Sequence, residues 1–130
     1  METRERQTKQ KKLIYEAMSS LDHPTATEVY GYVHERYPTI SRATVFRVLG
    51  GFAEHGRALE LKVAGKDTRY DYNVARHSHA HCKVCGKVAD VTPREEIKAS
   101  SALKENGGFV VESVAVEYIG YCPSCYAELG

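Results

Sequence analysis

The chain has 130 residues, with 18 Lys and Arg against 17 Asp and Glu and a formal net charge of +1. This length suits one domain or two small ones and excludes a barrel enzyme or a dinucleotide-binding fold with a second domain. The sequence contains no run of about 18 apolar residues, so no segment is expected to span a membrane. The N-terminus METRERQTKQKK lacks the apolar stretch of a secretory signal. We therefore expect a cytoplasmic protein with no membrane partner.

Three helices are predicted in the first part of the chain. Apolar residues recur at helical spacing over residues 4–20. Thr25 followed by Glu28 is a capping box that begins a second helix. A third helix is expected to have Ser41 as its N-cap and Gly56 as its C-cap.

Two β-like runs, LELKV and TRYDY, follow these helices and are separated by the turn AGKD. Three short helices followed by a hairpin form a winged helix-turn-helix, in which the third helix presents its exposed face to DNA. The alternative is an ordinary solvated helix face. A net charge of +3 over residues 1–76, against −2 over residues 77–130, favours DNA. The candidate DNA contacts on the third helix, the wing and the N-terminal helix are Ser41, Arg42, Thr44, Phe46, Arg47, Lys66, Arg69 and Lys11.

The back half is predicted to be a small α/β domain. VADV at 88–91 is a strand, and a helix is expected from Thr92 to about Glu105. The β-rich run FVVESVAVEYIGY could bury one face against a partner chain, and Pro123 begins a short terminal helix. A domain of roughly 54 residues buries too little surface to be stable by itself, so metal binding and dimerisation are expected to stabilise it.

All four cysteines lie in two C-x-x-C pairs, Cys82 with Cys85 and Cys122 with Cys125. Two residues between thiolates allow both sulfurs to reach one ion, and four such sulfurs close a tetrahedral zinc site. The alternatives are two disulfides or a thioredoxin-type redox motif. The absence of a secretory signal indicates a reducing compartment, which favours bound metal over disulfides. We expect a structural Zn²⁺ site, which has no open position for catalysis.

Three histidines alternate in RHSHAHC, so in an extended segment they point to one side. Carboxylates lie just before and after them, in RYDY and KVADV, and His23 lies between the first two predicted helices. Imidazole and carboxylate groups together suit Fe²⁺, Mn²⁺ or Zn²⁺. The alternative is a polar hinge with surface histidines.

The succession HPTATEVY, SRATVFRVL, RYDY, HSHAHCKVCGKVAD and GYCPSC resembles the ferric uptake regulator family over nearly the whole chain. That family comprises dimeric, metal-dependent bacterial transcription regulators. The resemblance implies an α+β fold, with a winged-helix DNA-binding domain over residues 1–75 and a dimerisation and metal-binding domain over residues 76–130. It also implies a homodimer that binds double-stranded DNA, as a repressor on palindromic A/T-rich operators.

The resemblance places the family's structural zinc on the four cysteines and a regulatory Fe²⁺ or Mn²⁺ on His23, Asp71, His77, His79 and Asp90. Asp90 is similar to the aspartate of the family's peroxide sensors, where iron sensors usually have glutamate. Peroxide sensing by oxidation of His23 or His77 is therefore expected, with sensing of iron or another divalent metal as the alternative. A non-haem metalloenzyme would leave the helix-turn-helix pattern unexplained, and so short a chain offers no substrate pocket. We expect no enzyme and no small organic substrate.

Overall fold

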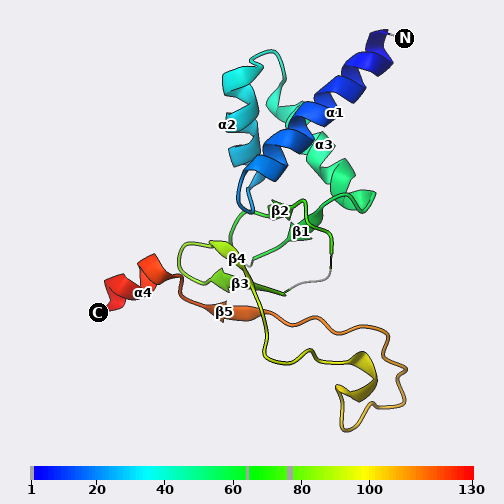
Figure 1. The fold of residues 1–130 in the computed structure, drawn as a ribbon, viewed down its shortest axis with the longest axis vertical. Helices are drawn as coiled ribbons and strands as arrows, with labels where there is room; N and C mark the ends of the chain where they lie inside the picture. Colours follow the sequence, from blue (N-terminus) through cyan, green and yellow to red (C-terminus); the bar gives the residue numbers. More distant parts are fainter. Residues whose placement is uncertain (1, 64, 76–77) are drawn as a thin grey trace. The chain divides into compact units, whose positions relative to one another are not determined.

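The computed structural model describes residues 2–63, 65–75 and 78–130, and the chain divides into two compact units, Met1–Ala75 and Arg76–Gly130 (Figure 1). Within the part of the chain that the structure describes, no helix is long and apolar enough to cross a membrane.

The N-terminal unit consists of three helices followed by a two-stranded antiparallel hairpin (Figure 1). Its elements are α1 (Glu2–Ser20), α2 (Ala26–Arg36), α3 (Arg42–Glu54), β1 (Leu59–Leu61) and β2 (Arg69–Asp71). The capping box is confirmed, because Thr25 Oγ1 accepts from the Glu28 backbone N–H and Glu28 Oε1 accepts from the Thr25 N–H. This order of elements is the predicted winged helix-turn-helix.

Both ends of α3 depend on the residues that flank it. Ser41 is its N-cap, as predicted, and the Ser41 hydroxyl accepts from the Thr44 N–H at 3.1 Å. The C-cap is His55 rather than Gly56, so the predicted cap is wrong by one residue. Gly56 follows with φ of +74°, a left-handed conformation that costs glycine little and that closes the helix.

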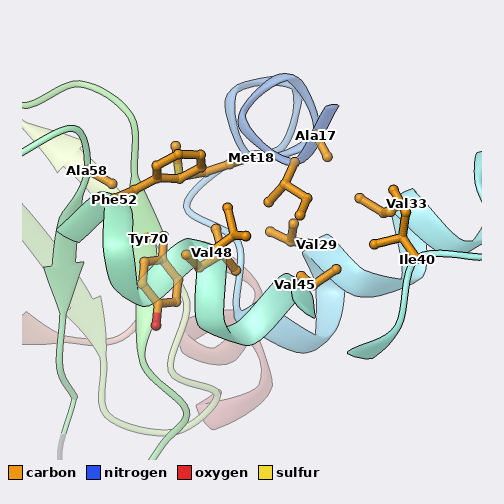
Figure 2. Packing of buried hydrophobic residues seen from close by; sticks show 12 residues of the cluster. Ala17, Met18, Val29, Val33, Ile40, Val45, Val48, Phe52, Ala58 and Tyr70 are labelled. Atoms are coloured by element: carbon orange, nitrogen blue, oxygen red, sulfur yellow. The ribbon is translucent and has the colours of Figure 1, made fainter. Parts of the chain in front are cut away.

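One hydrophobic core joins the three helices to the hairpin. Figure 2 shows Met18, Val29 and Val45 from the three helices, and Tyr70 from β2, among the side chains of this cluster. The members with almost no exposed surface are Ile14, Ala17, Met18, Val29, Val33, Val45 and Leu49. This unit therefore has an apolar core of its own, to which each helix contributes one stripe.

The C-terminal unit is built on a three-stranded sheet of order β4-β3-β5, in which β3 pairs antiparallel with β4 and parallel with β5. Its regular elements are β3 (Ser78–Cys82), β4 (Val88–Val91), a 3₁₀ turn (Ala99–Ser101), β5 (Tyr118–Gly120) and α4 (Pro123–Leu129). The strand at 88–91 and the terminal helix from Pro123 are confirmed.

The helix predicted from Thr92 to Glu105 is wrong, since only the 3₁₀ turn Ala99–Ser101 forms there. A helix of this length is marginal unless it buries an apolar face, and its two large apolar residues, Ile97 and Leu103, are about half exposed. The run FVVESVAVEYIGY also forms less strand than its composition suggests, because only Tyr118–Gly120 pairs with β3. In both segments the sequence favours regular structure, but the described residues of this unit offer no apolar surface for that structure to pack against.

Candidate metal centres and DNA-facing helix

The first cysteine pair lies on a tight turn between β3 and β4. Cys82 ends β3, and its backbone N–H and carbonyl bond to the Lys87 carbonyl and the Gly86 N–H, both at 2.9 Å. Gly86 has φ of +80°, which permits this sharp return. The Lys87 N–H donates to Cys85 Sγ at 3.4 Å. The backbone therefore holds both sulfurs on the same side of one turn.

The second pair reaches the first through tertiary structure. Strand β5 lies beside β3, with Gly120 opposite Cys82, and the Lys83 N–H donates to the Gly120 carbonyl at 2.8 Å. This pairing delivers Cys122, the N-cap of α4, and Cys125 in the first turn of α4. All four sulfurs then lie within 4.8 Å of one another.

The spacing of these sulfurs fits a tetrahedral ion. All four cysteines are free thiols, and Cys85 Sγ lies 3.8 Å from Cys122 Sγ. A zinc–sulfur bond near 2.3 Å in a tetrahedral site puts neighbouring sulfurs about 3.8 Å apart. The structure thus contains the arrangement of a closed Cys₄ zinc site and neither of the two disulfides that were the alternative.

The pKa values of the cysteine thiols also favour a bound cation. Backbone N–H groups of Cys85 and Cys122 that face the Cys82 sulfur lower the pKa of Cys82 to about 5. The Cys125 N–H lowers the pKa of Cys122 in the same way. The Cys125 thiol forms a hydrogen bond with the Cys122 sulfur. This hydrogen bond, together with burial, raises the pKa of Cys125 to about 12. A divalent cation would remove the repulsion between thiolates and displace the proton that Cys125 retains.

The second group of predicted ligands begins, in the N-terminal unit, with His23. Its side chain is 8% exposed, and its Nε2 lies 3.4 Å from Oδ2 of Asp71, which is 6% exposed. The other carboxylate oxygen of Asp71 accepts from the Asn73 N–H at 3.0 Å. Among the described non-glycine residues, only His23 has a positive φ, at +45°. The structure therefore brings a buried imidazole against a buried carboxylate.

Strand β2 holds the His23 loop in place. The Tyr70 N–H donates to the Pro24 carbonyl at 2.8 Å, and Arg69 Nη1 donates to the His23 carbonyl at 2.9 Å. Arg69 Nη1 also lies 3.3 Å from Oε1 of Glu28, whose side chain completes the capping box of α2. Sequence reasoning assigned Arg69 to the DNA surface, but the structure places it, mostly buried, between the wing strand and the loop that carries His23, where it bonds to both.

We expect Arg69→Met to destabilise the N-terminal unit by about 1–3 kcal/mol, the cost of a buried acceptor left without its donor. Methionine keeps the apolar stem and loses the bonds to His23 and Glu28. Urea unfolding of the metal-free protein measures the change, and Arg47→Met, on the exposed face of α3, is the matched control. Equal stability of the two variants would show that the tie contributes nothing.

In the C-terminal unit, His79 and Asp90 are paired by strand register. They lie directly opposite each other on β3 and β4, so both side chains leave the same face of the sheet. His79 Nε2 is 3.3 Å from Asp90 Oδ1, and Asp90 is half exposed. His77, which we predicted as a ligand and as a site of oxidation, lies outside the described residues.

Some of the predicted DNA contacts on α3 are exposed side chains, and others already form hydrogen bonds within the unit. Arg47 and Phe46 are exposed, and the Arg42 guanidinium lies over the Phe46 ring, 4.5 Å from its centroid. Arg42 Nη2 also donates to Thr27 Oγ1 of α2 at 3.1 Å. The Ser41 hydroxyl is occupied in the helix cap and bonds to the half-buried Thr44. Elsewhere in this unit, Lys66 and Lys11 are exposed on the wing turn and α1.

Sequence reasoning missed Asp22, whose Oδ1 lies 2.5 Å from Nδ1 of His23. The available signal was its position directly before a predicted ligand. It also missed the role of Glu28 beyond the capping box, because the contact between Glu28 and Arg69 joins residues that are far apart in the chain.

A helix-turn-helix unit joined to a unit with a Cys₄ cluster, with a histidine–carboxylate pair in each, defines a metal-dependent transcription regulator. Residues 2–119 match the sequence model of the Ferric uptake regulator family, and the chain belongs to this family. The chain is 33% identical over 125 residues to the peroxide operon regulator of Bacillus subtilis, covering 95% of this chain and 86% of that protein. It is 32% identical over 111 residues to the peroxide-responsive repressor PerR of Staphylococcus epidermidis, covering 85% and 74%.

Solved structures agree with this assignment. The crystal structure of the Campylobacter jejuni peroxide stress regulator superposes with a TM-score of 0.72 and 26% identity, covering 95% of this chain and 94% of that chain. These relatives are regulators rather than enzymes. The predicted fold class and the predicted class of function are both confirmed.

Proposed function

We propose that this chain is a peroxide-responsive, metal-dependent repressor that acts as a homodimer on palindromic A/T-rich DNA in the cytoplasm. The observation that carries the proposal is the pairing of a histidine with a carboxylate in each unit, His23 with Asp71 and His79 with Asp90. The likeness to the Bacillus subtilis and Staphylococcus epidermidis regulators supports the peroxide branch.

The regulatory ligands we propose are the five predicted ones. Imidazole nitrogens and carboxylate oxygens form a donor set that suits Fe²⁺ or Mn²⁺, whereas the four thiolates suit the structural Zn²⁺. An ion bound by His23 and Asp71 together with His77, His79 and Asp90 would couple the DNA-binding unit to the dimerisation unit. Such an ion is a ligand that favours one of two conformational states.

DNA binding is proposed for the exposed face of α3. Arg47 and the stacked pair Arg42–Phe46 provide guanidinium groups and an apolar ring on one helix face. Guanidinium groups bind phosphates and guanine edges, and an aromatic ring contacts the thymine methyl group. Lys66 and Lys11 add positive charge for the DNA backbone, whereas Arg69 is omitted because its guanidinium is engaged with His23 and Glu28.

A second copy of the chain is proposed to cover the apolar surface of the C-terminal unit. Phe109 is 75% exposed and Val110 is 93% exposed, and both lie at the start of the run that the sequence predicts as β-rich. Burial of these side chains in a homodimer would provide the packing surface that this unit lacks. A dimer also presents two copies of α3, which matches a palindromic site.

Peroxide sensing follows from the same ligands. Bound Fe²⁺ supplies the redox chemistry that a peroxide needs in order to react, and Mn²⁺ does so poorly. His23 or His77 then gains one oxygen atom on its ring while the peroxide is reduced to water. An oxidised ring is a poorer ligand, so the protein loses its metal and releases DNA.

The test is a titration of a labelled A/T-rich palindromic duplex with metal-free, Mn²⁺-loaded and Fe²⁺-loaded protein, before and after peroxide. We expect either metal to raise DNA affinity by about 5–150-fold, the usual range of allosteric coupling. Peroxide should abolish the gain with Fe²⁺ and leave it with Mn²⁺. Binding that responds to metal but not to peroxide would indicate the alternative, an iron or divalent-metal sensor. Binding without any metal dependence would contradict both.

Paired variants identify the DNA-facing helix in the same assay. Arg47→Ala should weaken binding by about 1–3 kcal/mol if its side chain reads a base. Arg94→Ala removes the same charge from the C-terminal unit and should have little effect.

A further inference from the structure

Both ring nitrogens of His23 face a carboxylate. Nδ1 lies 2.5 Å from Oδ1 of Asp22, and Nε2 lies 3.4 Å from Oδ2 of Asp71. The two carboxylates differ in environment, since the side chain of Asp22 is 75% exposed and that of Asp71 is 6% exposed. Asp22 therefore lies at the solvent side of a buried imidazole.

The backbone fixes where these groups meet. His23 has φ of +45°, and its carbonyl accepts from Arg69, while the next carbonyl, of Pro24, accepts from Tyr70. These bonds tie the two residues after Asp22 to strand β2. The backbone directly after Asp22 is thus held by strand β2, and Asp22 contacts the ring through a short side chain.

The short contact at Nδ1 determines the position of the ring proton. A carboxylate oxygen accepts only, so at 2.5 Å the Nδ1 must carry a hydrogen and donate it. In the neutral ring the lone pair then lies on Nε2, which is the nitrogen that faces Asp71. Metal-binding histidines commonly donate their second N–H to a carboxylate, which fixes the tautomer and strengthens the ligand.

We propose that Asp22 is a positioning residue for the regulatory metal, whose carboxylate keeps the hydrogen on Nδ1 and so makes Nε2 the ligand atom of His23. The inference rests on the proposed function for the identity of the site, but the tautomer itself can be measured without any metal. If Asp22 were only a surface ion-pair partner, its removal would alter neither the tautomer nor the metal affinity.

The first experiment is nitrogen NMR of the histidine rings in the metal-free full chain, recorded on the neutral imidazole, with His23→Gln to assign the His23 signals. In the wild type, His23 should carry its hydrogen on Nδ1. In Asp22→Ala this preference should disappear, and in Asp22→Asn it should weaken, because the amide oxygen can accept from Nδ1–H but the amide NH₂ can also donate to an unprotonated Nδ1. A wild-type ring with its hydrogen on Nε2 would overturn the proposal.

The second experiment measures Mn²⁺ affinity by competition with a chromophoric chelator. Asp22→Ala should weaken binding about 10–100-fold, the usual effect of removing such an outer carboxylate. Asp22→Asn should fall between this variant and the wild type. Asp67→Ala, which removes an exposed aspartate on the wing turn, is the matched control and should bind as the wild type does. Thermal unfolding of the metal-free variants should match the wild type.

The outcomes separate this inference from the proposed function. Wild-type affinity in Asp22→Ala, with Mn²⁺ bound by both proteins, would overturn the positioning role and leave the metal site intact. Failure of the wild type to bind Mn²⁺ would overturn the proposed site, and with it the role of Asp22 there. A large loss of stability in metal-free Asp22→Ala would show that the residue supports the fold rather than the ligand.

Discussion

Cys82→Ser is expected to remove bound zinc and to unfold the C-terminal unit, while the N-terminal unit stays folded. Among the described residues of the C-terminal unit, the only buried apolar side chains are those of Cys82 and Val88. So small a core cannot offset the conformational entropy of the chain. Zinc binding to such a cluster contributes about 10–16 kcal/mol of apparent free energy, so most of the stability of this unit should depend on the ion.

The N-terminal unit does not share this dependence. Its cluster joins residues from all three helices to Tyr70 of the hairpin, and side chains such as Ile14 and Leu49 are fully buried. Burial on this scale is what maintains small helical units without a metal. Hydrogen exchange should therefore show protected amides in α1–α3 and fast exchange in β3–β5 of the variant.

Elemental analysis and the same exchange measurement on the wild type supply the reference. Val84→Ser changes an exposed residue between the two cysteines of the first pair and should retain both zinc and protection. If Cys82→Ser lost zinc but kept the protected sheet, the site would have to be dispensable for folding. Retention of zinc with three sulfurs would contradict a closed four-thiolate site.

The sequence predicted best the elements whose signals are local. The Thr25–Glu28 capping box and the Ser41 cap depend on residues three positions apart, and both form as expected. The strands at β1, β2 and β4 also agree with their short apolar patterns. Local hydrogen bonding and periodicity were sufficient in these places.

Prediction failed where a segment needs something to pack against. The capping signal at Thr92 has the same form as the one at Thr25, yet only Thr25 begins a helix, because α2 buries Val29 and Val33. Ile97 and Leu103 have no such core within the described residues of the C-terminal unit. Capping selects where a helix begins, and tertiary burial decides whether it forms.

For the sites, residue types were predictable and their supporting contacts were not. C-x-x-C spacing and resemblance indicated which cysteines, histidines and carboxylates to consider. The position of Arg69 behind His23 depends on pairing between β2 and the loop before α2, which no local pattern encodes. The same holds for the contact between Asp22 and His23, which forms in a loop where His23 has a positive φ.

The length of the carboxylate side chain at position 90 is expected to control the response to peroxide. Asp90 is held opposite His79 by strand register, so Asp90→Glu adds one methylene at a fixed backbone position. The longer side chain would reach further toward an ion held by these residues and would leave that ion less open to peroxide. We expect oxidation of His23 to slow by about tenfold or more, equivalent to about 1.4 kcal/mol in activation free energy.

Mass spectrometry of Fe²⁺-loaded protein after peroxide measures this effect as the gain of one oxygen atom on the peptides that contain His23 or His77. Metal-dependent DNA binding of Asp90→Glu should survive the treatment that abolishes it in the wild type. Asp67→Glu makes the same change on the wing turn and should stay peroxide-sensitive, and Mn²⁺-loaded wild type should gain no oxygen. Equal oxidation of wild type and Asp90→Glu would show that carboxylate length does not set the response. Absence of oxidation in the Fe²⁺-loaded wild type would leave iron or divalent-metal sensing as the function, because the ligands would then bind an ion without reacting at it.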